Sequence, residues 1–239
     1  MDFDVIRPLF GGKLTQQQVD GTNHLLSMWG RYGDGDNRKL AYLLATAAWE
    51  TAYTMRPIHE RGPKSYFKKY EPGTPIGKAL GNTVPGDGYK FRGRGHVQLT
   101  GRRNYAKAGK AFGVDLVKEP DLALSPDISA RVLITGCLEG WFTGKKLGDY
   151  IRDGVDATDL LDYKNARRVI NGQDKAAQIA SMARVFEQAV GAEIPRQVKK
   201  DPEPAVTIPR EALPQASFWI RLQALAGLFI AALKRILKW

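Results

Sequence analysis

Residues 38–55 carry apolar side chains on two sides of a single predicted helix. Leucine and alanine residues recur at helical spacing along one side, while Tyr42, Trp49 and Tyr53 recur along another. A helix that is apolar on two sides is usually buried. We therefore expect this segment to form the central helix of the fold, and we expect Pro57 to end it.

Further helices are predicted from capping residues and periodicity. One begins after Thr15, whose hydroxyl can form a reciprocal capping box with Gln18. A second begins at Ser125, a predicted cap that is followed by proline, and covers residues 126–142. The last core helix spans residues 174–190. These segments predict a mainly α-helical, lysozyme-like domain with little or no sheet.

The stretch between these helices at residues 60–95 is different in character. It is rich in glycine, proline, lysine and tyrosine and shows no sustained hydrophobic period. Long loops in compact domains are often functional. We therefore expect a long loop region that lines one wall of a cleft.

Net charge and cysteine content bound the partners and the compartment. The formal net charge of +11 predicts attraction to polyanions, which include nucleic acids and bacterial envelopes. No nucleic-acid-binding motif is present, but the charge alone does not choose between these partners. The single cysteine, Cys137, excludes an intramolecular disulfide and is expected to be a small buried residue. The N-terminus lacks the basic and apolar pattern of a secretory signal.

The run YKFRGRGHVQLTGRRNY at residues 89–105 is a candidate binding motif. Its glycines let the backbone approach a ligand closely. The amides of Gln98 and Asn104 and the hydroxyl of Thr100 suit a polyhydroxylated, N-acetylated sugar.

Two upstream glutamates could supply the carboxyl groups that glycoside hydrolysis usually needs. Glu50 falls at the apolar edge of the central helix, close in angle to Leu43, which would raise its pKa as a general acid requires. The alternative is a surface glutamate on an amphipathic helix. Glu60 lies just past the predicted helix, and its alternative role is an ion pair with Arg56 or Arg61.

Together with LTQQQVDG at residues 14–21 and Ile-Asn-Gly at residues 170–172, these motifs resemble glycoside hydrolase family 19. The resemblance is to its chitinase-like lysozymes, in the form found in phage endolysins. It covers most of the first 190 residues. It implies an enzyme without a cofactor that cleaves β-1,4 bonds of peptidoglycan by general acid/base catalysis with inversion.

The resemblance also implies roles for individual residues. Glu50 is implied as the general acid, Glu60 as the base that activates water, and Thr100 as a residue that holds this water. Thr100, Asn104 and Asn171 have an alternative role in turns or in helix packing. Four residues are implied to bind the substrate: Tyr89, Gln98, Asn104 and Asn171.

The chain departs from the family pattern in ways that bear on the substrate. Trp49 stands where the family often has histidine before its acid, which puts the tuning of that acid in doubt. The spacing of the glutamates differs from that of plant chitinases, and the plant disulfides are absent. Both differences favour peptidoglycan over chitin. His24, His59 and His96 match no metal-ligand spacing, so no metal is expected.

The sequence predicts three parts: a catalytic domain at 1–191, a Pro-rich linker at 192–216 and a cationic amphipathic helix at 217–239. The longest uncharged run of that helix, 222–233, is twelve residues, short of the ~20 that span a bilayer. We therefore expect an interfacial helix; packing onto the catalytic domain and a transmembrane anchor are the alternatives. The residues expected to meet the membrane are Phe218, Trp219, Arg221, Leu222, Leu225, Phe229, Leu233, Lys234, Arg235, Ile236, Lys238 and Trp239.

The resulting hypothesis is a monomeric endolysin whose partners are peptidoglycan and an anionic membrane or lipopolysaccharide surface. It would be made in the cytoplasm of a bacterial host without a signal peptide and would act on the wall in the periplasm after release. A chitinase of the same fold is the first rival. A membrane-permeabilising antibacterial protein with a wall-targeting domain is the second, and a nucleic-acid-binding protein is a distant one.

Overall fold

The computed structural model describes residues 1–152 and 160–191, and these are largely helical. The α-helices are α1 (Phe3–Ile6), α2 (Gln16–Tyr32), α3 (Asn37–Glu50), α4 (Pro75–Ala79), α5 (Asp87–Lys90), α6 (Arg102–Phe112), α7 (Pro126–Glu139), α8 (Tyr163–Ala166) and α9 (Ala176–Val190). The 3-10 helices are η1 (Arg7–Phe10), η2 (Lys64–Tyr70), η3 (Pro120–Leu124), η4 (Leu147–Asp149) and η5 (Arg167–Val169). The strands form two antiparallel pairs: β1 (Ile58–His59) with β2 (Arg94–Gly95), and β3 (Ile151–Arg152) with β4 (Leu160–Leu161). The mainly α-helical prediction is confirmed.

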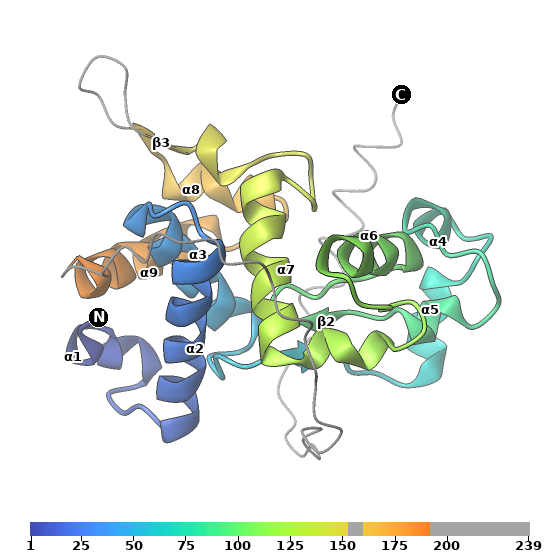
Figure 1. Cartoon of the computed structure of the whole chain (residues 1–239), viewed down its shortest axis with the longest axis horizontal. Coiled ribbons are helices and arrows are strands. Elements are labelled where there is room, and N and C mark those ends of the chain that lie inside the picture. Colours follow the sequence, from blue (N-terminus) through green and yellow to red (C-terminus); the bar gives the residue numbers. More distant parts are fainter. Residues whose placement is uncertain (153–159, 192–239) are drawn as a thin grey trace. The chain divides into compact units, whose positions relative to one another are not determined.

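The helices form two groups on either side of α7 (Figure 1). One group contains α1, α2, α3, α8 and α9, in which α3 packs against α9 and α2 packs against α7. The other contains α4, α5 and α6, with η2 packed against α5. Strand β2 lies between the groups and contacts α7. The chain therefore crosses from the first group to the second between α3 and η2.

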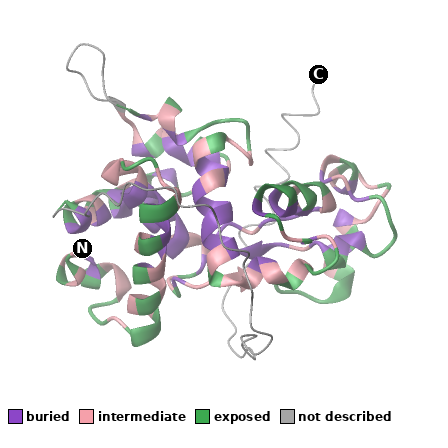
Figure 2. Cartoon of the chain, in the orientation of Figure 1, coloured by how far each residue is buried: buried purple, intermediate pink, exposed green. Residues whose placement is uncertain are grey.

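Helix α3 is the centre of its group, as predicted. Every residue from 40 to 48 is buried, and Figure 2 shows buried residues gathered along this helix and α7. Burying a leucine side chain contributes about 1.5–3 kcal/mol. The predicted end near residue 55 is wrong, because the helix ends at Glu50. Beyond it, Ala52, Tyr53 and Met55 have φ angles of 50°, 63° and 56°, which are not helical.

The other predicted helices are present with small differences. Thr15 and Gln18 form the predicted capping box at the start of α2. Helix α7 begins at Pro126 as predicted, but the Ser125 side chain makes no capping hydrogen bond. Helix α9 buries the apolar face expected of the last core helix. Cys137 is buried in α7, and burial raises the pKa of its thiol.

The predicted loop region at residues 60–95 contains short ordered elements. Phe67, Tyr70 and Leu80 form a small hydrophobic core there, and Ile58 and His59 of β1 pair with Gly95 and Arg94 of β2. This pairing fixes the position of Glu60, which follows β1. None of the helices within residues 1–152 and 160–191 has both the length and the apolarity to span a bilayer. The predicted linker and amphipathic helix lie outside the described residues.

Candidate active site

Glu50 is the last residue of α3, and its carboxylate contacts an arginine from another part of the chain. Arg167 donates from Nη1 to Glu50 Oε1 at 2.6 Å, and the two side chains are 1% and 9% exposed. Among the residues that the structure describes, no group hydrogen-bonds Oε2 of Glu50. The glutamate is therefore not a solvated surface residue. One carboxyl oxygen is held in place by Arg167, and the other has no hydrogen-bond partner among the described residues.

Arg167 is itself fixed by local structure. It begins η5, and its Nε donates to the carbonyl of Asp174 at 3.2 Å. The backbone N–H of Asn171 donates to the Arg167 carbonyl at 3.0 Å, which places the predicted sugar-binding asparagine one turn away. A buried charge is stable only when it is paired and hydrogen-bonded. Arg167 therefore orients Glu50 directly. The purely apolar surroundings expected for this carboxyl are not what the structure shows.

Glu60 is half-buried in the second group of helices and makes no ion pair in the described part of the chain. Its Oε1 accepts from the Tyr70 hydroxyl at 3.0 Å, and its Oε2 accepts from the Gly93 N–H at 3.1 Å. The ion pair with Arg56 or Arg61 that the sequence left open is not formed. Burial raises the pKa of Tyr66 and of Tyr70, and the Glu60 carboxylate adds to both effects.

Gln98, Thr100 and Asn104 lie in one hydrogen-bonded segment next to Glu60. The Gln98 side chain donates to the carbonyls of Ile58 and Gly95, so it holds the β1–β2 pair together. Thr100 Oγ1 donates to the Gln98 carbonyl at 2.7 Å. Asn104 Nδ2 donates to the Thr100 carbonyl at 2.7 Å.

Two features of this segment concern Gln98 itself. Its backbone φ of 54° is left-handed. This conformation costs a non-glycine residue about 1–3 kcal/mol and is often found at functional sites. A Cβ built on Gly93 would lie 2.7 Å from Gln98 Oε1 and 3.1 Å from Gln98 Cβ, so a larger residue there would displace the Gln98 side chain. Contacts of Gln98 with sugars stay a prediction.

The predicted site residues thus fall into two sets. Glu60, Gln98, Thr100 and Asn104 belong to the β1–β2 side, and Glu50 and Asn171 belong to the α3–η5 side. No hydrogen bond joins the two sets within residues 1–152 and 160–191. Tyr89 is 36% exposed on α5, and its ring packs edge-on against Phe67.

A fixed turn connects the two glutamates along the chain. Its three left-handed residues are held by neighbours: Gln18 Nε2 donates to the Tyr53 carbonyl at 2.9 Å, and Thr51 Oγ1 accepts from the Met55 N–H at 3.1 Å. Helix α2 approaches so closely that a Cβ on Gly21 would meet the Met55 carbonyl oxygen at 2.2 Å. The position of Glu60 relative to Glu50 therefore depends on α2.

His96 contacts the same turn from the β2 side. Its buried ring lies close to the Met55 backbone, and Ser129 Oγ lies 2.6 Å from Nδ1. The Ser129 hydroxyl also accepts from the His96 backbone N–H at 2.8 Å. Burial is the main reason that the pKa of His96 is lowered to about 4. His96 is therefore a neutral link between β2, α7 and the turn.

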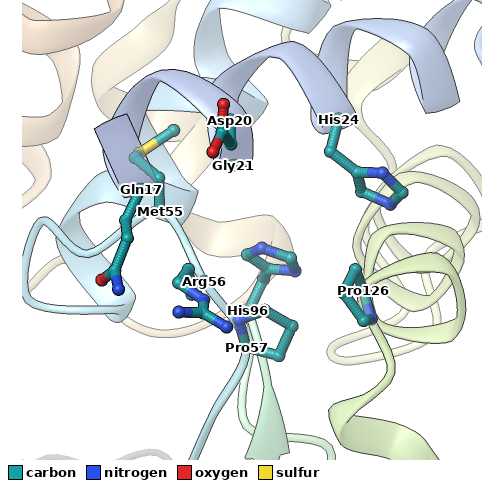
Figure 3. A pocket seen from close by; sticks show the side chains of 9 residues that line it. All are labelled: Gln17, Asp20, Gly21, His24, Met55, Arg56, Pro57, His96 and Pro126. Carbon is teal, nitrogen blue, oxygen red and sulfur yellow. The ribbon is translucent and has the colours of Figure 1, made fainter. Parts of the chain in front are cut away.

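A cavity of about 350 Å³ lies beside this link, away from the predicted site residues. Figure 3 shows Gln17, Asp20, Gly21 and His24 of α2 on one side of it, with Arg56, Pro57 and His96 across from them. His24 Nε2 lies 3.1 Å from the carboxylate of Asp127. The remaining lining residues are Met55, Arg56, Pro57, His96 and Pro126.

The neutral His96 predicts a specific dependence of stability on pH. The pKa of the ring is about 4 in the folded protein and ordinarily 6.5, so the unfolded chain binds the proton first as the pH falls. The free energy of unfolding should therefore decrease by up to about 3 kcal/mol as the pH falls from 6.5 to 4. Replacing His96→Gln should lower stability at neutral pH but flatten this part of the profile. Denaturant unfolding at a series of pH values measures both; parallel profiles would contradict the assignment.

Sequence reasoning missed two partners of the glutamates. Arg167 could not be recognised because the burial of an arginine is decided by packing, although its position four residues before Asn171 places it in the same segment. Tyr70 was part of a region predicted as loop, where no period indicated burial. Both residues contact a carboxylate from a distant part of the chain.

A family model described as chitinase class I, of glycoside hydrolase family 19, matches residues 22–146, just over half of the 239 residues. The match includes both glutamates and the 89–105 motif but not Arg167 or Asn171.

Relatives and a solved structure point the same way. Chitinase 8 of Oryza sativa is 59% identical over 85 residues, which are 36% of this chain and 28% of that protein. A glycosyl hydrolase family 19 domain-containing protein of Haemophilus influenzae is 43% identical over 54 residues, 23% of this chain and 26% of that protein. Each alignment thus spans less than a third of the relative. The crystal structure of chitinase C from Streptomyces griseus superposes with a TM-score of 0.55 at 17% identity, covering 78% of this chain and 90% of that one. This likeness concerns the fold.

Proposed function

Because the chain belongs to glycoside hydrolase family 19, we propose that it is an endolysin that cleaves β-1,4 glycosidic bonds in the glycan strands of peptidoglycan. The observation that carries this proposal is the pair of glutamates, Glu50 and Glu60, with different partners. Glu50 is oriented by an arginine, and Glu60 is held by a tyrosine hydroxyl and a backbone N–H. Glycoside hydrolysis uses two carboxyl groups in two such different roles.

The proposed mechanism is a single displacement. Glu50 in its protonated form gives the proton on its free oxygen to the glycosidic oxygen as the bond to the anomeric carbon breaks. Glu60 accepts a proton from a water molecule whose oxygen forms the new bond to that carbon from the opposite face. Thr100 lies in the segment next to Glu60 and is proposed to hold this water. The configuration at the anomeric carbon is inverted, and exchange with solvent restores both glutamates.

Peptidoglycan is proposed as the substrate because of charge. The chain carries a formal net charge of +11, and bacterial walls are polyanionic, whereas chitin is neutral. Chitin is the second candidate, because several relatives are named chitinases or endochitinases. Which bond of peptidoglycan is cut follows from the sugar at the new reducing end.

The experiment is mass spectrometry of the products released from purified sacculi, with borohydride reduction to label the new reducing end. Soluble muropeptides with a single type of reducing sugar are the expected result, and they identify the bond. Chitin hexamers are the matched neutral substrate. Cleavage of the hexamers with no release from sacculi would replace the endolysin proposal with a chitinase.

The predicted helix at residues 217–239 is proposed to deliver the enzyme to an anionic membrane. Truncation after Pro214 should preserve the rate on purified peptidoglycan but abolish binding to anionic vesicles, because each lost cation contributes ~1 kcal/mol at such a surface. High salt should weaken vesicle binding by the full chain. Vesicle sedimentation and sacculus turbidity measure the two effects. Loss of activity on free peptidoglycan would instead assign the helix to the catalytic domain.

Killing assays distinguish this proposal from the alternative that the protein mainly permeabilises membranes. Bacterial killing by the full chain should disappear when Glu50 is replaced. Killing that survives that replacement would make the wall-binding domain a targeting module.

A further inference from the structure

Cationic side chains lie over tyrosine rings on the side of the molecule that holds Glu60. Lys69 Nζ lies 3.5 Å from the ring centre of Tyr66. Arg92 Cζ lies 4.2 Å and Lys64 Nζ 5.4 Å from the ring centre of Tyr89. Cation–π contacts of this kind hold a charge in place while leaving N–H donors free. We call Lys64, Lys69 and Arg92 the basic wall.

The basic wall borders the proposed base directly. Lys69 precedes Tyr70, whose hydroxyl donates to Glu60, and the Glu60 carboxylate acts electrostatically on Lys69. Arg92 precedes Gly93, whose N–H donates to the other oxygen of Glu60. A substrate positioned for attack by a water on Glu60 would therefore pass these cations.

No residue of the basic wall forms an ion pair within the part of the chain that the structure describes, although carboxylates are close by. Glu71 accepts from the N–H groups of Gly86 and Gly88. Asp87 is buried and paired with Arg102 at 2.6 Å. Glu60 is held by Tyr70 and Gly93. Within the described residues, only Asp87 of these three acidic groups is ion-paired, so no carboxylate fixes the cations of the wall in a salt bridge.

Cations that are held in position without a salt bridge, beside a proposed glycan-cleaving site, favour an anionic ligand. A chitin chain carries no charge, so it gains nothing from them. The peptide stems of peptidoglycan carry carboxylates that project from every second sugar. Lys64 and Lys69 lie on η2, which also carries Tyr70, and Arg92 precedes Gly93, so all three cations belong to the segments that hold Glu60.

We propose that Lys64, Lys69 and Arg92 form a subsite for the carboxylates of the peptide stems and thereby select peptidoglycan over neutral glycans. This inference rests on the proposed function and adds to it the residues that set substrate choice. Tyr66 and Tyr89 act as platforms that position the cations. None of these residues takes part in proton transfer.

The test compares two variants that remove the same amount of charge. Lys64→Gln with Arg92→Gln removes two cations of the wall, and Lys110→Gln with Lys118→Gln removes two exposed cations elsewhere. Rates are measured on soluble glycan strands with native peptide stems, on the same strands after amidation of their carboxylates, and on chitin hexamers. Binding to both kinds of strand is measured separately.

The wall variant should lose about 10-fold in kcat/KM on native strands and less than about twofold on amidated strands and chitin hexamers. The control variant should change by less than about twofold on all three. Equal losses on native and amidated strands, or no loss, would overturn the subsite. Wild-type protein that cleaves only the hexamers but binds native strands through the wall would overturn the proposed function and keep the subsite. Wild-type protein that neither cleaves nor binds native strands would overturn both.

Discussion

Glu50→Gln should lower turnover on purified peptidoglycan by about 10²-fold or more while leaving the fold intact. The loss follows from the proton, because a side-chain amide cannot act as the general acid. The fold should survive because the carbonyl oxygen of glutamine can still accept from Arg167 Nη1, as Glu50 Oε1 does at 2.6 Å. Initial rates on sacculi and thermal unfolding of the same preparation measure the two effects.

The matched comparison for this variant is Glu187→Gln. That residue lies on α9, and its carboxylate accepts from the Tyr163 hydroxyl at 3.1 Å, away from the proposed site. It should leave the rate unchanged. A well-folded Glu50→Gln protein with a rate near that of wild type would remove Glu50 from the mechanism.

Arg167→Met should destabilise the protein by about 3–5 kcal/mol, because it leaves the Glu50 carboxylate buried without its partner. The side chains of Arg167 and Glu50 are 1% and 9% exposed, so solvent does little to screen the lost interaction. Activity should fall as well, since the carboxyl is no longer held in one orientation. Arg167→Lys keeps the charge but loses the second donor to Asp174. Its stability and its activity should lie between those of wild type and Arg167→Met.

A double-mutant cycle separates the ion pair from general packing. In the Glu50→Gln background no buried negative charge remains, so Arg167→Met should then lose clearly less stability than in wild type. Denaturant unfolding of the four proteins gives the coupling free energy. If the stability losses of the two single variants add up to that of the double variant within about 0.5 kcal/mol, the two side chains do not depend on each other.

The sequence predicted the helical elements better than the contacts between them. Thr15 and Gln18 were sufficient to predict the start of α2 because a capping box is a local interaction. The end of α3 was not predictable, since Tyr53 is held in a left-handed conformation by Gln18, thirty-five residues away. Apolar side chains continue through that turn, because Met55 is buried and the Tyr53 ring packs against Trp49.

The candidate site shows the same division. Motifs identified Glu50, Glu60 and the segment of Thr100, but the partners of the two glutamates come from other elements. Arg167 reaches Glu50 across 117 residues, and Tyr70 reaches Glu60 across ten. Pairing of this kind is decided by tertiary packing. The sequence alone does not distinguish an arginine that will be buried from one that will be exposed.

The turn between the two glutamates has a consequence for engineering this domain. Ala52, Tyr53 and Met55 hold conformations that they would not keep in a free peptide, and Gln18, Gly21 and His96 supply the contacts that maintain them. The spacing of the proposed acid and base is therefore determined by residues that have no proposed role in proton transfer. Grafting residues 50–60 onto another helical scaffold would transfer both carboxyl groups without their relative placement. A redesign must carry α2 and the β2 segment along with them.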